Sequence, residues 1–239
     1  MTDTVVVIPA YNEGGKIRGV VAKIQGAAPD AHVLVVDDGS KDDTAVEAKA
    51  GGAEVIRLPF NLGYGGALQT GFKYALMRGY RYAVQIDADG QHEPSFIPKL
   101  LAAVKGGEAD VALGSRFLGL GEYKATVARG LGMRIFGGIA SFFIGRKVTD
   151  ATTGFQALNH DALRFYASEF YPVDFPDADV LIMLHRAGLK TVEVPVVMYP
   201  RAEGKSMHSG LKPLYYIFKM FLSIFVTLLR KNTFRKGAA

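Results

Sequence analysis

Two carboxylates stand two residues apart after an apolar segment of the chain, in the tripeptide Asp87-Ala88-Asp89. Carboxylates at this spacing can share a hard divalent cation such as Mg²⁺ or Mn²⁺, which then bridges the phosphates of a ligand. The same tripeptide also occurs by chance, because aspartate is common in turns at strand ends. A metal site is therefore a hypothesis that depends on what lies beside these residues.

Two more polar clusters follow apolar segments. In Tyr11-Asn12-Glu13, the tyrosine could stack on a base and the glutamate could accept a hydrogen bond from ribose. In Asp37-Asp38-Gly39-Ser40, one carboxylate could accept from a base N–H or from ribose, as the acid after a strand does in dinucleotide-binding domains. The alternatives are a polar loop for the first cluster and a turn for the second, with Ser40 as the N-cap of the following helix.

The elements that must position these clusters alternate regularly. Short apolar segments predict strands, periodic segments between them predict helices, and the alternation predicts a doubly wound α/β domain with a mostly parallel sheet. Ligands of such sheets bind beyond the carboxyl ends of the strands, so all three clusters should share one edge, which favours the metal hypothesis. The predicted strands are 5–9, 32–37, 53–58, 82–87, 110–113, 153–158 and 191–198, and the helices are 15–26, 41–50, 63–78, 94–105, 126–144 and 178–187.

Composition excludes several classes of protein. Of the 239 residues, 49% are hydrophobic and 21% are charged, which excludes a disordered or low-complexity chain. Cysteine is absent, which removes disulfides, cysteine-ligated metals and a thiol nucleophile. The first residues contain an acid and lack the pattern of a signal peptide, so a cytosolic location is expected.

The positive charge is concentrated in the tail. Residues 201–239 contain eight of the 28 Lys and Arg residues and one of the 23 Asp and Glu residues, a net charge of +7, so residues 1–200 have a net charge of −2. A basic tail suits an anionic surface such as phosphate, nucleic acid or acidic lipid. No uncharged apolar run is long enough to predict a transmembrane helix.

Other residues are weaker candidates. The glycine-rich segment 61–66 is similar to a phosphate-binding loop, but it follows the third strand and is interpreted as tight helix–strand packing. His92 and His208 could bind a metal, although a surface histidine is the expected role. Basic residues outside the strands could neutralise phosphates or be solvated charges, namely Arg116, Arg129, Arg134, Arg201 and Lys205.

Seven ordered segments, spanning about residues 1–207, carry a family resemblance. They resemble the motifs of inverting nucleotide-sugar glycosyltransferases of the family 2 type with the GT-A fold, which is Rossmann-like. The closest resemblance is to dolichyl- and polyprenyl-phosphate sugar transferases of the dolichol-phosphate mannose synthase type. The segments are VVVIPAYNEGGKI, VVDDGSKDDT, NLGYGGALQTGFKYAL, QIDADGQHEPSFIPKLL, LGSRFLG, TDATTGFQAL and VEVPVVMYPRAEGKS.

The resemblance implies roles for matching positions. The nucleotide-sugar donor would be held by Pro9, Ala10, Tyr11, Glu13, Val36, Asp37, Asp38, Asp87, Ala88, Asp89, Gln91, Arg116, Arg201 and Lys205. Within this set, the metal ligands would be Asp87, Asp89 and Gln91, and the catalytic residues would be Asp89, Arg116 and Arg201. The acceptor side would comprise Arg129, Asp150, Thr153 and Gly154.

Three positions depart from the family pattern. Gln156 stands where arginine is common, Met133 replaces the serine of the acceptor helix, and Lys205 has moved within the closing motif. The nucleotide end of the prediction is therefore firmer than the acceptor end.

The resemblance implies transfer of a sugar from a nucleoside-diphosphate sugar, of the GDP-mannose or UDP-glucose type, to a polyprenyl or dolichyl phosphate with Mg²⁺ or Mn²⁺. A hydroxyl acceptor, with Asp177 or Asp179 as base, is the alternative. A nucleotidyltransferase and an inactive membrane scaffold are further alternatives. We expect no nucleic-acid partner, and a homo-oligomer or a membrane-protein partner is left open.

The predicted domains are 1–209 for transfer, with a nucleotide-sugar half at 1–115 and an acceptor half at 116–209, and 210–239 for membrane contact. On a helix starting at Pro213, Lys212, Lys219, Ser223 and Arg230 form one narrow polar face and apolar residues cover most of the rest. Such a helix is expected in the bilayer interface with its cations toward the headgroups, and Arg235 and Lys236 extend the basic edge. This placement predicts a peripheral protein on the cytoplasmic face. The alternative is a helix docked on its own domain or on a dimer partner.

Overall fold

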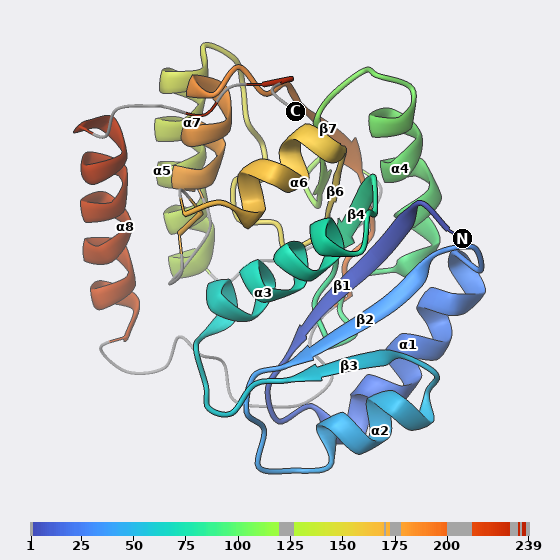
Figure 1. The fold of residues 1–239 in the computed structure, drawn as a ribbon. Helices are drawn as coiled ribbons and strands as arrows, with labels where there is room; N and C mark the ends of the chain where they lie inside the picture. Colours follow the sequence, from blue (N-terminus) through green and yellow to red (C-terminus); the bar gives the residue numbers. More distant parts are fainter. Residues whose placement is uncertain are drawn as a thin grey trace.

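The fold is built on one seven-stranded sheet, seen in a computed structural model (Figure 1). The structure describes residues 2–119, 127–169, 171–172, 178–199, 212–229, 234 and 236–237. The strands are β1 (Thr4–Ala10), β2 (His32–Asp37), β3 (Glu54–Arg57), β4 (Tyr82–Gln85), β5 (Val111–Ser115), β6 (Gln156–Leu158) and β7 (Thr191–Pro195). Their order is β3-β2-β1-β4-β6-β5-β7, and only β6 runs antiparallel to its neighbours.

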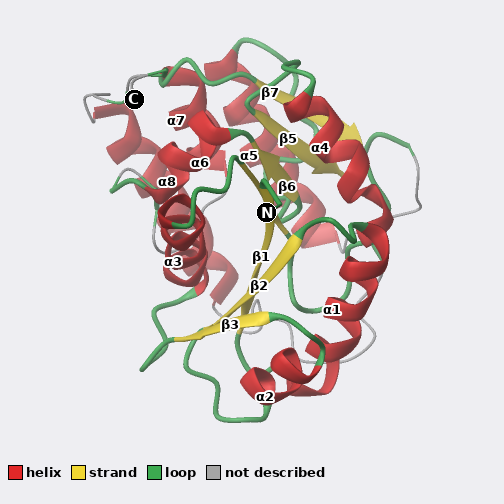
Figure 2. Cartoon of the chain, turned by 45° about the vertical axis from the view of Figure 1, so that its right-hand side comes forward, coloured by secondary structure: helices red, strands yellow, loops and turns green. Residues whose placement is uncertain are grey.

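Helices cover both faces of this sheet, as Figure 2 shows. The strand sequences are nearly continuous apolar runs, and β1 is buried along its whole length, as expected for a sheet with two covered faces. One face carries α1 (Gly14–Ala27), α2 (Thr44–Ala50) and α4 (Ile97–Lys105). The other face carries α3 (Tyr64–Met77), α5 (Val127–Ile144), α6 (His160–Ala167) and α7 (Ala178–Arg186). The predicted doubly wound α/β fold is confirmed.

The start of α2 corrects one prediction. Ser40 is not its N-cap, because the helix begins at Thr44 and the Ser40 hydroxyl accepts a hydrogen bond from the Asn12 backbone N–H at 2.9 Å. Asp42 accepts from the Thr44 backbone N–H at 3.1 Å instead. Pro94 lies in a one-turn 3₁₀ helix, Pro94–Phe96, directly before α4, where a missing N–H costs nothing.

The C-terminal helix α8 (Lys212–Leu229) packs on α7 and α5. The Ser223 hydroxyl donates to the Asp179 carboxylate, and Ile224 and Thr227 are buried. Ser223, expected on a polar face turned toward the headgroups, therefore faces the domain instead, as in the alternative of a helix docked on its own domain, because the buried carboxylate of α7 requires a donor. None of the described helices combines the length and the apolarity needed to cross a bilayer.

The end of the chain folds back on the domain beside α6. The Phe234 ring meets the Phe165 ring edge to face at 5.2 Å. Lys236 pairs with the nearly buried Asp110 at 2.6 Å, so this cation does not extend a basic edge as expected. Asp110 also accepts from the Lys190 backbone N–H at 2.6 Å and from the Asn159 amide at 2.8 Å.

Asp110→Asn should destabilise the fold in a pH-dependent way. Burial would raise the pKa of Asp110, but its bonds from Lys236, Lys190 and Asn159 outweigh burial and hold that pKa below 3.8. A depressed carboxyl pKa stabilises the fold above the unfolded pKa, and this contribution is lost as pH falls through the folded pKa. We expect a loss of about 1–3 kcal/mol at pH 7 that shrinks below about pH 4, measured by urea unfolding.

Asp161→Asn is the matched control, since Asp161 accepts from the Gly237 backbone N–H at 3.2 Å in an exposed setting. Equal losses in the two variants, or a gap that does not narrow in acid, would contradict the role given to Asp110.

Candidate active site

The register of the sheet brings the three predicted polar clusters to one edge. In the parallel pairing, Ala10 lies opposite Asp37 on β2 and Val7 lies opposite Gln85 on β4. The segments beginning at Tyr11, Asp38 and Asp87 therefore leave the sheet side by side. Their predicted common edge is confirmed.

The loops after β1 and β2 hold each other through backbone contacts. Asn12 adopts a left-handed conformation with φ of 55°, and its amide oxygen accepts from the Lys41 backbone N–H at 2.9 Å. The Glu13 backbone N–H donates to the Thr44 hydroxyl at 2.8 Å. Tyr11 is 44% exposed above this pair of loops, where its ring is open to a stacking partner.

Asp37 and Asp38 shape the neighbouring loops. Asp37 is fully buried, accepts from the Ser40 backbone N–H at 3.0 Å and lies 3.3 Å from the Arg57 guanidinium. Asp38 accepts from the backbone N–H groups of Leu62 at 2.7 Å and Gly63 at 3.0 Å. Burial raises the pKa of Asp38, and the negative charge of Asp37 adds to that rise.

An open pocket of about 380 Å³ lies beside these two aspartates. It is lined by Gly39, Ser40, Arg57, Leu58 and Pro59. A nucleoside contact by Asp37 or Asp38 stays a prediction, as do the donor contacts assigned to Pro9, Ala10, Glu13 and Val36.

Asp87 lies in a tight setting at the end of β4. Its Oδ1 accepts from the Tyr64 hydroxyl at 2.7 Å, and its Oδ2 lies 3.3 Å from His92 Nε2. A Cβ added to Gly154 would lie 2.6 Å and 2.8 Å from the two carboxylate oxygens, so only glycine fits there without a shift. Burial would raise the pKa of Asp87, but contacts with His92 and Tyr64 and the charge of Arg116 hold it below its usual value. The carboxylate is therefore ionised.

Asp89 and Gln91 complete the turn after β4. Asp89 Oδ1 accepts from the Gln91 backbone N–H at 3.0 Å, and the Gln91 amide donates to the Tyr199 carbonyl at 3.0 Å. This bond orients the amide nitrogen of Gln91 toward Tyr199 and leaves its amide oxygen as an acceptor.

This donor set fits a divalent cation that arrives with a phosphate ligand. Among the described residues, no group of three acidic, histidine or cysteine side chains could hold a metal ion by itself. Mg²⁺ is commonly bound by one or two carboxylates together with substrate phosphates rather than by an all-protein cage. Asp87 and Asp89 would be those two carboxylates, and metal binding by them stays a prediction.

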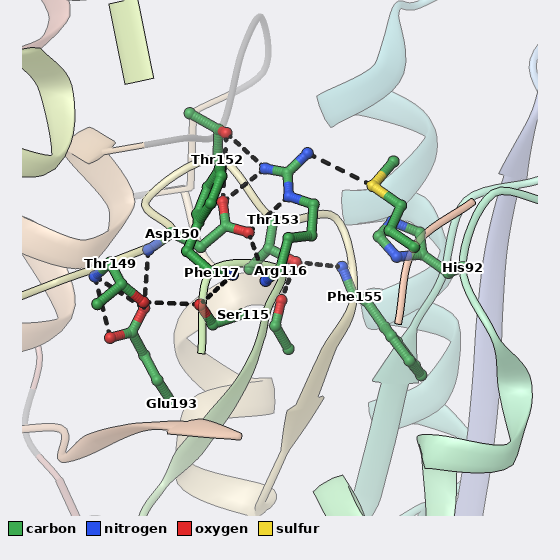
Figure 3. Close-up of polar contacts among 12 residues, drawn as sticks. His92, Ser115, Arg116, Phe117, Thr149, Asp150, Thr152, Thr153, Phe155 and Glu193 are labelled. Atoms are coloured by element: carbon green, nitrogen blue, oxygen red, sulfur yellow. Dashed lines mark hydrogen bonds and ion pairs between the residues drawn. The ribbon is translucent and has the colours of Figure 1, made fainter. Parts of the chain in front are cut away.

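Arg116, directly after β5, is engaged in a buried ion pair (Figure 3). Its Nε donates to Asp150 Oδ2 at 2.6 Å and its Nη2 to Asp150 Oδ1 at 2.5 Å, and Nη2 also donates to the Thr152 hydroxyl at 2.9 Å. Arg116 is 4% exposed. Arg116 and Asp150, both predicted site residues, therefore lie at the same edge and bind each other. A phosphate contact by Arg116 stays a prediction.

Glu193 of β7 holds the other side of the 149–154 loop. Its carboxylate accepts from the backbone N–H groups of Thr149 at 2.9 Å and Asp150 at 2.8 Å (Figure 3). Farther along the loop, the Thr153 hydroxyl donates to the Gly114 carbonyl at 2.7 Å. These contacts fix Gly154 against Asp87, while the acceptor roles of Asp150, Thr153 and Gly154 stay predictions.

Several predicted residues lie outside the described part of the chain. These are Arg201, Lys205, His208 and Asp177, together with the side chains of Arg129, Met133 and Arg134. Gln156 is described and points inward, accepting from the Tyr166 hydroxyl at 2.7 Å.

The structure adds Tyr64 and Glu193 to the candidate site, and it places His92, already a candidate from the sequence, beside Asp87. His92 is 4% exposed, so the expectation of a surface histidine is wrong. The position of His92, three residues after Asp89, indicates from the sequence that it lies near the candidate site. The sequence contains no such signal for Glu193, which is one polar residue in an apolar strand.

Comparisons with known proteins give a consistent result. The sequence profile of the family described as "Glycosyl transferase family 2" matches residues 5–166. The chain is 34% identical to an undecaprenyl-phosphate mannosyltransferase of Micrococcus luteus, over 85% of this chain and 86% of the relative. It is 32% identical to a polyprenol monophosphomannose synthase of Mycolicibacterium smegmatis, over 91% of this chain and 85% of the relative.

A solved structure shares the fold. It is glucosyl-3-phosphoglycerate synthase from Mycobacterium tuberculosis in complex with Mn²⁺ and uridine-diphosphate-glucose. The TM-score is 0.70 at 23% identity, over 96% of this chain and 80% of that chain.

Asp150→Ala should strongly destabilise the protein, because it removes the carboxylate that accepts two hydrogen bonds from the buried Arg116 guanidinium. Breaking a buried pair from one side typically costs about 3–5 kcal/mol, whereas replacing both partners by apolar groups costs far less. We therefore expect the double variant Arg116→Met, Asp150→Ala to recover part of the loss, measured by chemical denaturation. A loss under about 1 kcal/mol in Asp150→Ala, or a double variant as unstable as the single one, would refute this account.

Proposed function

Because the chain belongs to glycosyl transferase family 2 and is a glycosyltransferase of the GT-A fold, we propose that it transfers a sugar from a nucleoside-diphosphate sugar to a polyprenyl phosphate. The observation that carries this proposal is the pair Asp87 and Asp89, placed at the carboxyl edge of the sheet beside the loops of β1 and β2. The relatives named for polyprenyl-phosphate mannosyl transfer, which match over most of the chain, support the acceptor class.

The donor's diphosphate would bind at Asp87, Asp89 and Gln91 together with Mg²⁺ or Mn²⁺. Such a cation, when bound, neutralises the charge that develops on the departing diphosphate. Tyr11 and the β1–β2 loops would hold the nucleoside, and Arg201 and Lys205 would contact phosphates. The acceptor oxygen would attack C1 from the side opposite the diphosphate, which inverts the anomeric configuration.

A phosphate acceptor requires no general base from the protein. The second pKa of a phosphate monoester is near 6, so the nucleophile is largely ionised at pH 7. A hydroxyl acceptor would need a base within hydrogen-bond reach. Asp179 is fully buried, and its carboxylate contacts Ser223 and the Val180 backbone N–H in the packing of α7 against α8. This setting disfavours the hydroxyl alternative that uses Asp179.

The outer face of α8 supports peripheral membrane binding. Five large apolar side chains are between 47% and 70% exposed on this helix, namely Phe221, Leu222, Phe225, Val226 and Leu229. A polyprenyl chain resides in a bilayer, so its phosphate must be met at the bilayer surface. We propose that this apolar face rests in the interface on the cytoplasmic side, while the Ser223 face packs on the domain. A second copy of the chain or a membrane protein is the alternative partner.

The nucleotidyltransferase and inactive-scaffold alternatives are weaker. A nucleotidyltransferase would want a glycine-rich loop with a basic residue after β1, where this chain has Tyr11 and Glu13. Membership of a transferase family and the intact carboxylate pair oppose an inactive scaffold.

Asp89→Ala should lower sugar transfer by about 10²-fold or more, because the variant loses a charge that faces the leaving diphosphate. The assay offers GDP-mannose and UDP-glucose with Mn²⁺, and a short-chain polyprenyl phosphate or the matching polyprenol. We expect product with the phosphate alone and none after addition of EDTA. Asp43→Ala is the control, since the Asp43 side chain makes no capping bond at α2. Equal transfer to the polyprenol would refute the acceptor class, and turnover in EDTA would refute the metal.

Phe225→Ser with Leu229→Ser should weaken binding to anionic liposomes at least about tenfold, since each buried apolar side chain contributes about 1.5–3 kcal/mol. Both side chains are exposed, so the thermal midpoint should hardly change. Val46→Ser removes an equally exposed apolar group from α2 and serves as control. Flotation with phosphatidylglycerol vesicles measures the effect. Wild-type protein that does not float, or a double variant that floats equally, would favour a protein partner.

A further inference from the structure

We propose that Tyr64 is the positioning residue for Asp87, holding this carboxylate in the orientation that receives the metal–diphosphate part of the donor. The inference rests on the proposed function, because it concerns the same site. It concerns a residue to which neither the sequence motifs nor the carboxylate pair gave a role.

The hydrogen bond between Tyr64 and Asp87 has a fixed direction. Gln85 Nε2 donates to the Tyr64 hydroxyl oxygen at 3.0 Å, and this hydroxyl lies 2.7 Å from Asp87 Oδ1. A hydroxyl has a single hydrogen, and its oxygen accepts here from Gln85, so the hydrogen points at Asp87. A tyrosine hydroxyl is protonated at neutral pH, so the Tyr64 hydroxyl has this hydrogen to donate.

The rest of the setting makes this bond decisive for orientation. The contact of Asp87 Oδ2 with His92 is longer, at 3.3 Å. Gly154 packs so closely against the Asp87 carboxylate that a Cβ at this residue would collide with it. Each carboxylate oxygen can accept more than one hydrogen bond, so Oδ1 can accept from Tyr64 and still face a cation. Without the Tyr64 hydroxyl, only His92 and Gly154 would limit rotation of the Asp87 carboxylate.

The position of Tyr64 is set in turn by the nucleoside side of the site. Asp38 holds the backbone N–H groups of Leu62 and Gly63, and α3 begins at the next residue, Tyr64. Gly63 has a φ of 86°, a conformation that favours glycine and allows the chain to enter the helix at this point. A continuous path therefore joins the carboxylate after β2 to the carboxylate after β4, across β1, through the first turn of α3.

The same helix provides a matched control. Tyr74 lies ten residues after Tyr64 on α3, and its hydroxyl donates to the Glu54 carboxylate at the opposite edge of the sheet. Tyr64→Phe and Tyr74→Phe thus remove the same chemical group and the same type of bond. They differ in whether the carboxylate belongs to the candidate metal site.

The test measures Mn²⁺ binding by the loss of the free-ion electron paramagnetic resonance signal, in the presence of UDP and, separately, of GDP. Tyr64→Phe should weaken Mn²⁺ binding about 10–100-fold, the usual effect of removing an outer partner of a metal ligand. Tyr74→Phe should stay within about twofold of wild type. In the transfer assay, Tyr64→Phe should raise the half-saturating Mn²⁺ concentration, and excess Mn²⁺ should restore most of kcat.

The outcomes separate this inference from the proposed function. Wild-type affinity in Tyr64→Phe, or equal losses in the two tyrosine variants, would overturn the inference and leave the function standing. Wild-type protein that binds no Mn²⁺ with either nucleotide would overturn both. If Tyr64→Phe does not fold, Gln85→Met replaces it, because Gln85 is buried and its amide oxygen has no hydrogen-bond partner among the residues that the structure describes. A several-fold weaker Mn²⁺ affinity supports the inference there, and an unchanged affinity overturns it.

Discussion

A guanidinium removed from water must keep a counter-charge, and this constraint organises the loop of residues 149–154 and the strands around it. Arg116 satisfies it through Asp150, which lies in the long connection between α5 and β6. The pairing pins the 149–154 loop to the end of β5, and Glu193 pins the same loop to β7. Gly154 then lies against Asp87, so the local geometry of the carboxylate after β4 depends on an ion pair formed two strands away.

The loops after β1, β2 and β3 are stabilised in a different way, by carboxylates that accept hydrogen bonds from backbone N–H groups. Asp37 accepts from a backbone N–H group of its own loop, and Asp38 and Asp42 accept from those of neighbouring segments, which satisfies donors that would otherwise lack partners at the ends of parallel strands. The acidic residues in the loop after β2 therefore stabilise the backbone conformation of the loops. Both kinds of contact affect Asp87, because its neighbour Tyr64 belongs to the earlier part of the chain and its neighbour Gly154 to the later part.

Much of this arrangement could be predicted from the sequence, because strands buried on both faces read as apolar runs and polar clusters after them must share an edge. The reversal of β6 could not, since three residues, Gln156–Leu158, have no local signal for direction and pairing partners decide it. The orientation of α8 could not either. A helical projection finds the stripe that contains Ser223, but only the tertiary structure shows that a buried Asp179 needs that hydroxyl. Tyr64 was hidden because its role depends on Gln85 and Asp87, which only the fold brings to its side.

The antiparallel strand β6 has a consequence for the order of folding. β4 and β5 do not pair with each other: β4 lies between β1 and β6, and β5 lies between β6 and β7, so the two strands are joined only through β6, which comes more than 40 residues after β5. When β5 leaves the ribosome, one side of β4 and both sides of β5 are therefore still unpaired, and such edges invite pairing with other chains. The pairing of β6 with β4 and β5 joins segments that are far apart in the sequence, and such pairing is slower than pairing between segments close in the sequence. The nascent chain is thus most exposed to aggregation in the interval between the emergence of β5 and that of β6.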